Sequence, residues 1–388
     1  MKNENIFIDP QLQKRHLKSK IFKLFAFSSL LVACLFLVWF LSDMVNRAIP
    51  AVKNNWIQIE VTYNETTIEN PRKSIDKKYR KIASKAWLRD IRFYVEKHPE
   101  LLDTTTLTWV LADDQVDQYI KGHNNRLKSK QKKIVDNLQE SGKLESRFNT
   151  IFFTRGDSKH PEYSGLLSAT VGTILTLLVT MAFAFPIGVM TSIYLEEFAP
   201  KNRFTEFIEI NINNLAAIPS ILFGLLGLAV FITLFGMPRS SPLVGGLTLG
   251  LMTLPIIIVS SRAALRTVPD SIREAGYGLG LTKWQIVKDH VLPLAMPGIL
   301  TGSIIGLAQA MGETAPLIIV GMIAFIPDSP TSITDAATVL PAQIFTWAGM
   351  PETAYIERTA AAILVLLVIL ITLNAIAIYL RKKYEIKW

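Results

Sequence analysis

Charged side chains beside or inside apolar stretches are the residues of this sequence most suited to chemistry. Arg262 and Arg266 stand four residues apart just after the uncharged stretch 242–261, so a helix would place them on one face. Two guanidinium groups there would suit an anion that leaves an apolar path. The alternative is that both arginines only anchor the helix end at the lipid headgroups.

Glu313 lies within another apolar stretch, where a carboxylate costs about 2.5–3.5 kcal/mol unless it faces protein or water. An ionised carboxylate repels an anion, so we expect Glu313 to act as a gate paired with an arginine and not as a ligand. Thr314 is a neighbouring hydrogen-bonding group, and Pro316 would kink the helix and free backbone carbonyls. The alternative role for Glu313 is a structural hydrogen bond at that kink.

Pro219 and Ser220 predict a second break inside an apolar stretch. Backbone N–H groups exposed at a broken helix would be available to an anion, as they are in many transporters. A kink that serves packing alone is the alternative. These six residues, from Pro219 to Thr314, are the candidates for a substrate path or gate.

Signals of catalysis or of a metal site are absent from the sequence. Gly142-Lys143 lacks the leading glycine and the following hydroxyl residue of a nucleotide-binding loop. Asp113, Asp114 and Asp117 lack the glycine and distal glutamate of a calcium loop. The five histidines show no ligand spacing: His16, His98, His123, His160 and His290. We therefore expect a protein that is not an enzyme and that holds no metal or cofactor.

Uncharged stretches of about 20 residues predict membrane helices, since that length crosses a hydrocarbon core of roughly 30 Å. Six are present: 24–42, 164–195, 211–238, 242–261, 291–312 and 360–380. The single cysteine, Cys34, lies in the first and excludes an internal disulfide.

The charge pattern orients these spans. The net charge of +9 comes from lysines and arginines that cluster beside the apolar stretches, which argues against nucleic acid as a partner. Under the positive-inside rule, both termini and the segment 262–290 are cytoplasmic. The sequence therefore predicts a multi-pass protein of a cytoplasmic membrane, all-α in its membrane part.

The polar segment 43–163 predicts a small α+β domain outside the cytoplasm. Residues 56–63 alternate between apolar and polar as a half-buried strand does, residues 83–102 are typical of an amphipathic helix, and 148–153 suggest a returning strand. The expected divisions are 1–42 with the first span, 43–163 as the inserted domain, and 164–388 as the main membrane domain.

The cytoplasmic segment from Glu274 to Pro293 reads EAGYGLGLTKWQIVKDHVLP. Pro269, Asp270 and Ser271 before it are typical of a helix start, and Gly280 interrupts the helical pattern. We expect a short helix, a glycine break and a second helix. Such a rigid knob between two spans would fit a partner's groove and pass its motion to the membrane helices.

This segment resembles the EAA loop of permeases of ATP-binding-cassette (ABC) importers. Five residues fall on the positions of that motif: Glu274, Ala275, Gly280, Leu292 and Pro293. Gly276 replaces its second alanine, and His290 replaces an aliphatic residue. The resemblance implies the type-1 permease fold with six transmembrane helices and coupling to an ATPase subunit, which binds the ATP.

Three further strings resemble the phosphate branch of these permeases, the PstA type, in a long form: YLEEFAPKNR at 194–203, IPSILFGL at 218–225 and MGETAPL at 311–317. The resemblance implies an importer of inorganic phosphate in the bacterial inner membrane. Its implied partners are a related permease in a heterodimer, two ATPase copies and an extracytoplasmic phosphate-binding protein. The alternatives are a permease for sulfate or molybdate, and a membrane-anchored sensor or scaffold that works through 43–163.

Overall fold

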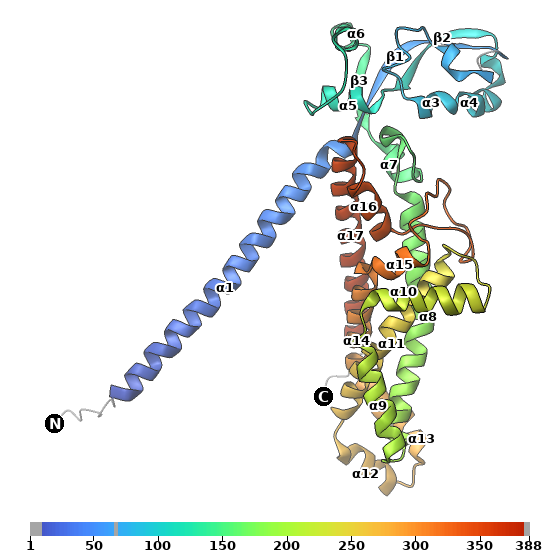
Figure 1. Cartoon of the computed structure of the whole chain (residues 1–388). Helices are drawn as coiled ribbons and strands as arrows, with labels where there is room; N and C mark the ends of the chain where they lie inside the picture. Colours follow the sequence, from blue (N-terminus) through green and yellow to red (C-terminus); the bar gives the residue numbers. More distant parts are fainter. Residues whose placement is uncertain (1–9, 66–68, 384–388) are drawn as a thin grey trace.

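The computed structural model describes residues 10–65 and 69–383, which form a helical body, a separate long helix and a small sheet domain at one end (Figure 1). Among the described residues, five helical segments are long and apolar enough to cross a membrane: Lys14–Val52, Leu167–Phe198, Pro242–Arg266, Lys283–Gly312 and Ala354–Lys383. The fold is therefore the helical membrane protein with a small α+β insertion that the sequence predicted.

The predicted third span, 211–238, differs from a straight helix. Helix α9 (Arg203–Leu215) ends before a short break, and α10 (Ser220–Gly227) continues into the π-helical turn η6 (Leu228–Leu234). The two parts meet at 103°, and they make a sixth span only when counted together. Pro219 forces the break, since its ring cannot continue the preceding helix.

The helical body is built from α8 (Leu167–Ile193), α11 (Pro242–Arg266), α14 (Leu292–Gly312) and α17 (Ala354–Lys383). Small residues let these helices approach closely, as in other membrane bundles. A Cβ at Gly246 would lie 2.5 Å from the Val179 Cβ, and one at Gly302 would lie 1.9 Å from the Ser260 hydroxyl. Short helices α15 (Ala315–Ile319) and α16 (Leu340–Ala348) complete the body.

Helix α1 (Pro10–Ala48) leans away from this body and meets it only near its C-terminal end (Figure 1). There, Ala48 packs in one apolar cluster with Trp347 and Tyr355. Large apolar side chains farther down α1 are exposed, including Phe25 at 73% and Trp39 at 64%. This surface is suited to lipid or to another membrane helix.

The sheet domain follows α1 and the short turn η1 (Ile49–Val52). Its three antiparallel strands have the order β2-β1-β3, with β1 (Lys53–Tyr63) between β2 (Thr104–Leu111) and β3 (Leu144–Phe148). Alternate β1 residues are buried, which confirms the predicted strand. They pack against helices of the same domain, α3 (Lys85–Arg89), α4 (Ile91–Lys97), α5 (Asp114–Ile120) and α6 (Ser129–Glu140).

Two predictions within this domain were wrong. The returning strand lies at β3 and not at 148–153, because the Asn149 side chain accepts the Phe152 N–H and caps helix α7 (Thr150–Thr154). The single helix expected over 83–102 is instead α3, α4 and the turn η3 (Pro99–Leu101). The chain bends at Asp90, whose carboxylate pairs with Arg155 outside the helix.

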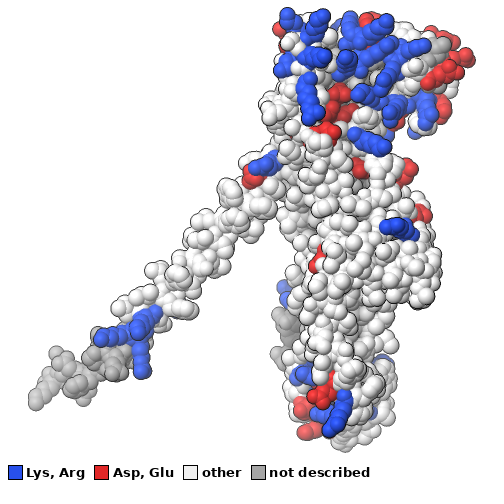
Figure 2. Space-filling view, viewed as in Figure 1, with Lys and Arg blue, Asp and Glu red and all other residues white. Residues whose placement is uncertain are grey.

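Charges gather at the two ends of the molecule and leave an almost uncharged band between them (Figure 2). The sheet domain carries many lysines and arginines, and a second group of charges surrounds α12 (Asp270–Gly278) and α13 (Lys283–Ile286) at the opposite end. A hydrocarbon layer would cover the band, because charges are costly there.

Candidate functional site

The segment 270–291 forms the protruding knob at the end of the molecule farthest from the sheet domain (Figure 1). Gly280 separates α12 from α13 and has a φ of +77°, a backbone conformation that favours glycine. Thr282 and Gln285 form a reciprocal capping box that starts α13. The π-helical turn η7 (Val287–Val291) then leads directly into α14. The expected helix, break and second helix are thus all present.

The knob turns much of its surface outward. Glu274 and Ala275 are exposed, and so are Tyr277, Leu279 and Trp284, with Leu279 81% accessible. Leu292 and Pro293 are half-buried in the first turn of α14. Exposed aromatic and aliphatic side chains surround a glutamate on this pair of short helices, and such a surface is suited to a protein partner.

Both departures from the motif have a structural explanation. A Cβ at Gly276 would lie 2.6 Å from the Ile286 Cγ1, so the two short helices approach too closely for an alanine. His290 is exposed and lines a cavity of about 350 Å³ with Ala275 and Pro293. Its polar ring therefore occupies no apolar core position.

Arg273, the residue before Glu274, clamps the knob to two membrane helices. Its Nη2 lies 2.6 Å from the Glu197 Oε1 and its Nε 3.3 Å from the Oε2, so the contact is bidentate. Its guanidinium also donates to the Leu265 and Val268 carbonyls at the end of α11. Hydrogen bonding to Glu197, in the turn η5 (Tyr194–Phe198) after α8, raises the pKa of Arg273. Arg273 therefore joins the knob to the ends of both α8 and α11.

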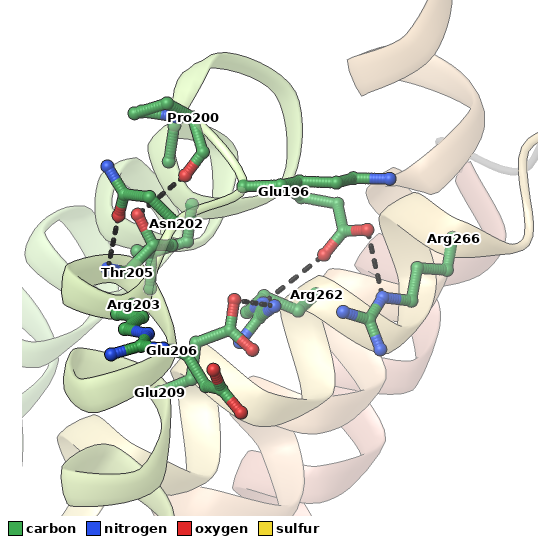
Figure 3. A pocket seen from close by; sticks show the side chains of 12 residues that line it. Glu196, Pro200, Asn202, Arg203, Thr205, Glu206, Glu209, Arg262 and Arg266 are labelled. Carbon is green, nitrogen blue, oxygen red and sulfur yellow. Dashed lines mark hydrogen bonds and ion pairs between the residues drawn. The ribbon is translucent and has the colours of Figure 1, made fainter.

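Arg262 and Arg266 line a cavity of about 550 Å³ at the same end, between η5, α9 and α11 (Figure 3). Arg262 pairs with Glu196 at 3.2 Å and with Glu209 of α9 at 2.6 Å. Arg266 pairs with Glu196 at 2.8 Å and is 60% exposed. The two guanidinium groups share a site, as expected from their spacing, but carboxylates neutralise them in this conformation.

Sequence reasoning missed these carboxylate partners. Glu196 and Glu197 are adjacent in the string at 194–203, at the cytoplasmic end of one predicted span. Three arginines follow the cytoplasmic end of another predicted span: Arg262, Arg266 and Arg273. These opposite charges at the same side of the membrane could have indicated the ion pairs. Their π-helical turn places Glu196 toward Arg262 and Glu197 toward Arg273, so one turn serves both networks.

The short helices that follow the two predicted breaks pack together in the middle of the body (Figure 1). Glu313 ends α14 and Thr314 precedes α15, whereas Pro219 and Ser220 begin α10. Helices α10 and α15 touch, since a Cβ at Gly224 would lie 2.7 Å from the Pro316 Cα. Within residues 10–65 and 69–383, no ion pair joins Glu313 to an arginine. Glu313 is half-buried, and α10 and α15 lie at a similar level of the body (Figure 1).

Known protein families match two parts of this sequence. Residues 184–386, more than half of the chain, match the family described as binding-protein-dependent transport system inner membrane component. Residues 9–83 and 69–130 match a domain family of unknown function, DUF3333.

Several relatives are named as phosphate transport permeases. The chain is 33% identical to the phosphate transport system permease protein PstA 1 of Mycobacterium tuberculosis over 56% of this chain and 70% of that protein. It is 32% identical to PstA of Yersinia pestis over 57% and 74% of the two chains. It is 29% identical to the permease protein PstC of Pasteurella multocida over 57% and 77%. From this match and its helical architecture, the chain belongs to the family of binding-protein-dependent transport system inner membrane components.

Proposed function

We propose that this chain is a permease subunit of an ATP-driven importer of inorganic phosphate. The observation that carries the coupling part of the proposal is the exposed pair of short helices at 270–291, which Arg273 joins to α8 and α11. The phosphate part is supported by the names of the PstA relatives, at 33% and 32% identity. The knob and the segment that matches the transport family, residues 184–386, belong to the same helical body.

The knob faces the cytoplasm in this proposal, together with both termini, and the sheet domain lies outside the inner membrane. Arg381, Lys382 and Lys383 in the last turn of α17 support this orientation. An ATPase subunit binds the surface around Glu274, Ala275 and Gly280. That subunit binds the ATP, and this chain contributes no cofactor and no catalytic group.

A second, related permease completes the path. The similarity to PstC as well as PstA supports a heterodimer of homologous subunits, with one ATPase beneath each. An extracytoplasmic binding protein delivers phosphate at the other side. When the ATPases close on ATP, they move the two knobs, and each membrane body rocks as its clamped helices follow.

Arg262 and Arg266 serve as a cationic exit that opens when their carboxylates withdraw. In the present geometry Glu196 bridges both arginines, and Glu209 holds Arg262 to α9. Separation of both η5 and α9 from α11 would release two positive charges at the cytoplasmic mouth. An anion would then meet guanidinium groups, which bind phosphate well.

Glu313, Thr314, Pro219 and Ser220 line the central part of the path in this proposal. Broken helices at mid-membrane offer unpaired backbone groups to a substrate. Glu313 acts as a gate whose cationic partner comes from the second permease, because the described part of this chain gives it none.

Uptake of radiolabelled phosphate tests the proposal, in cells whose other phosphate importers are deleted. We expect uptake to require this chain and to resist a hundredfold excess of sulfate or molybdate. R262Q and E313Q should each reduce uptake at least tenfold without loss of the protein from the membrane. Phosphate uptake unchanged by deletion, with loss of sulfate or molybdate uptake, would assign the chain to another oxyanion.

Co-purification of an ATPase separates a transporter from a sensor or scaffold that works through residues 43–163. We expect an ATPase to purify with the wild-type chain and to be lost from E274K and G280W. G278A is the control, since a Cβ at Gly278 meets no atom within 4 Å and the φ of Gly278 is not positive. Equal recovery from all variants would remove the coupling role, and recovery of no ATPase would favour the scaffold.

A further inference from the structure

The outer edge of the sheet domain leaves part of strand β2 without a neighbour. Ala112 donates its N–H to the Asn55 carbonyl, and the paired register continues along β2. Hydrogen-bonded pairs in an antiparallel ladder fall on alternate residues. The backbone N–H and C=O groups of Thr105, Leu107 and Trp109 therefore point away from β1. No backbone hydrogen bond reaches them from residues 10–65 or 69–383.

This edge also lacks the features that usually protect an edge strand. Strand β2 reads TTTLTWVL, without a charged residue or proline, and Leu107 is 51% exposed. The chain itself starts to cover one end, where Ser84 donates its N–H to the Leu111 carbonyl and Ala83 bridges Ala112. The position beside Thr105, Leu107 and Trp109 lies along the same edge as this isolated bridge.

A cavity of about 400 Å³ opens between this part of β2 and helix α4. Six aromatic side chains line it: Trp56, Trp87, Phe93, Tyr94, Trp109 and Tyr163. Phe93 and Tyr94 are 48% and 46% exposed. Pockets of this volume that are lined by aromatic groups with a few polar ones are typical of binding sites.

The charges around the cavity are unequal. Asp90 is occupied, because its carboxylate pairs with Arg155 at 2.8 Å and accepts the Tyr163 hydroxyl. Arg147 lies 4.6 Å from the centre of the Trp109 ring. Lys97 lines the cavity and has no ion-pair partner in the described part of the chain. Arg147 is itself paired with Glu145 at 2.6 Å, so Lys97 supplies the unpaired positive charge of the lining, and it favours a ligand that carries a carboxylate.

We propose that this edge binds an extended peptide segment of a partner protein, which adds a fourth strand beside β2. Backbone hydrogen bonds to Leu107 and its neighbours hold the segment, as in other strand-addition complexes. Alternate apolar or aromatic side chains of the segment enter the cavity, and an acidic side chain or C-terminal carboxylate meets Lys97. A small molecule in the cavity alone would leave the outward backbone groups of β2 unused.

Fluorescence anisotropy on the full chain in nanodiscs tests this site. The probes are fluorescein-labelled heptapeptides with valine or phenylalanine at alternate positions and glutamate between them. Matched peptides N-methylated at alternate residues cannot form the ladder. We expect the parent peptides to bind at least tenfold more tightly than the methylated ones.

L107P is the decisive variant, because it removes one outward N–H while proline remains compatible with an edge strand. We expect at least a tenfold loss of affinity in L107P and less than threefold in L107T, which keeps the backbone donor. Hydrogen exchange gives a second measurement. The amides of Thr105, Leu107 and Trp109 should exchange rapidly in the free chain and slowly with peptide, whereas the Thr106 and Thr108 amides stay slow throughout.

Other outcomes would overturn the proposal. Equal affinity of L107P and L107T, with loss in W109A, would show that a side chain or small molecule fills the cavity without strand addition. Protection of Thr105, Leu107 and Trp109 that rises with protein concentration and needs no peptide would identify a second copy of this chain as the occupant. Failure of every peptide to bind would exclude the site as proposed. None of these results depends on phosphate transport.

Discussion

Replacement of Arg273 by glutamine tests how strongly the knob is tied to the membrane helices. The side chains of Arg273 and Glu197 are only 18% and 6% exposed, so the ion pair is largely removed from water. R273Q leaves the Glu197 carboxylate buried without its cation. Loss of one partner of such a pair costs about 3–5 kcal/mol, which is roughly a hundredfold to a few thousandfold in the ratio of folded to unfolded protein.

The double-mutant cycle with E197Q sharpens this estimate. E197Q alone keeps an acceptor for Arg273 and loses only the charge-assisted part of the contact, so we expect a cost of about 1–2 kcal/mol. The double variant R273Q/E197Q has no stranded charge and should lose less than the sum of the single variants, by about 1–3 kcal/mol. R266Q is the control, because Arg266 is 60% exposed and Glu196 keeps Arg262; its cost should stay below about 1 kcal/mol.

The free energies come from reversible unfolding in mixed micelles, followed by tryptophan fluorescence. Proteoliposomes that contain the whole transporter then give the ATP hydrolysed for each phosphate moved. We expect R273Q to raise that ratio, because a loosened knob moves without pulling α8. Strict additivity in the cycle, or an unchanged ratio in R273Q, would refute the role assigned to this pair.

Three further results follow from the same geometry. G276A should destabilise the knob by about 1–3 kcal/mol and reduce ATPase co-purification, because its new Cβ would lie 2.6 Å from Ile286. The double variant G276A/I286A removes this clash and should restore co-purification. Failure to restore it would contradict the clash. G280A forces alanine to a φ of +77° and should cost about 1–2 kcal/mol, against almost nothing for G278A, as read from thermal unfolding. Burial raises the pKa of Glu162 to about 7, so the contribution of this group to the stability of the sheet domain should be largest below about pH 4.5 and should fall by about 3 kcal/mol as the pH rises from about 4.5 to 7. Hydrogen exchange of β1 amides between pH 4.5 and 7.5, corrected for intrinsic rates, measures this loss, and E162Q should flatten it.

The sequence by itself determined the membrane architecture and the knob. Long uncharged stretches have one stable solution in lipid, since a helix satisfies its own backbone groups. The spacing from Glu274 through Gly280 to Pro293 depends on local helix chemistry, so the helix, glycine break and helix could be predicted without knowledge of any distant residue. Strand 56–63 was equally visible from its alternation.

Only the tertiary structure decided which charges meet. Arg262 reaches Glu196 and Glu209, and Arg273 reaches Glu197, across separations of 53 to 76 residues. After the bend of 103° between α9 and α10, helix α10 packs through Gly224 against Pro316 of α15. Local patterns contain no information about such contacts, because they depend on how whole helices pack. The free edge of β2 is equally non-local, since it is defined by a third strand that pairs on the far side of β1.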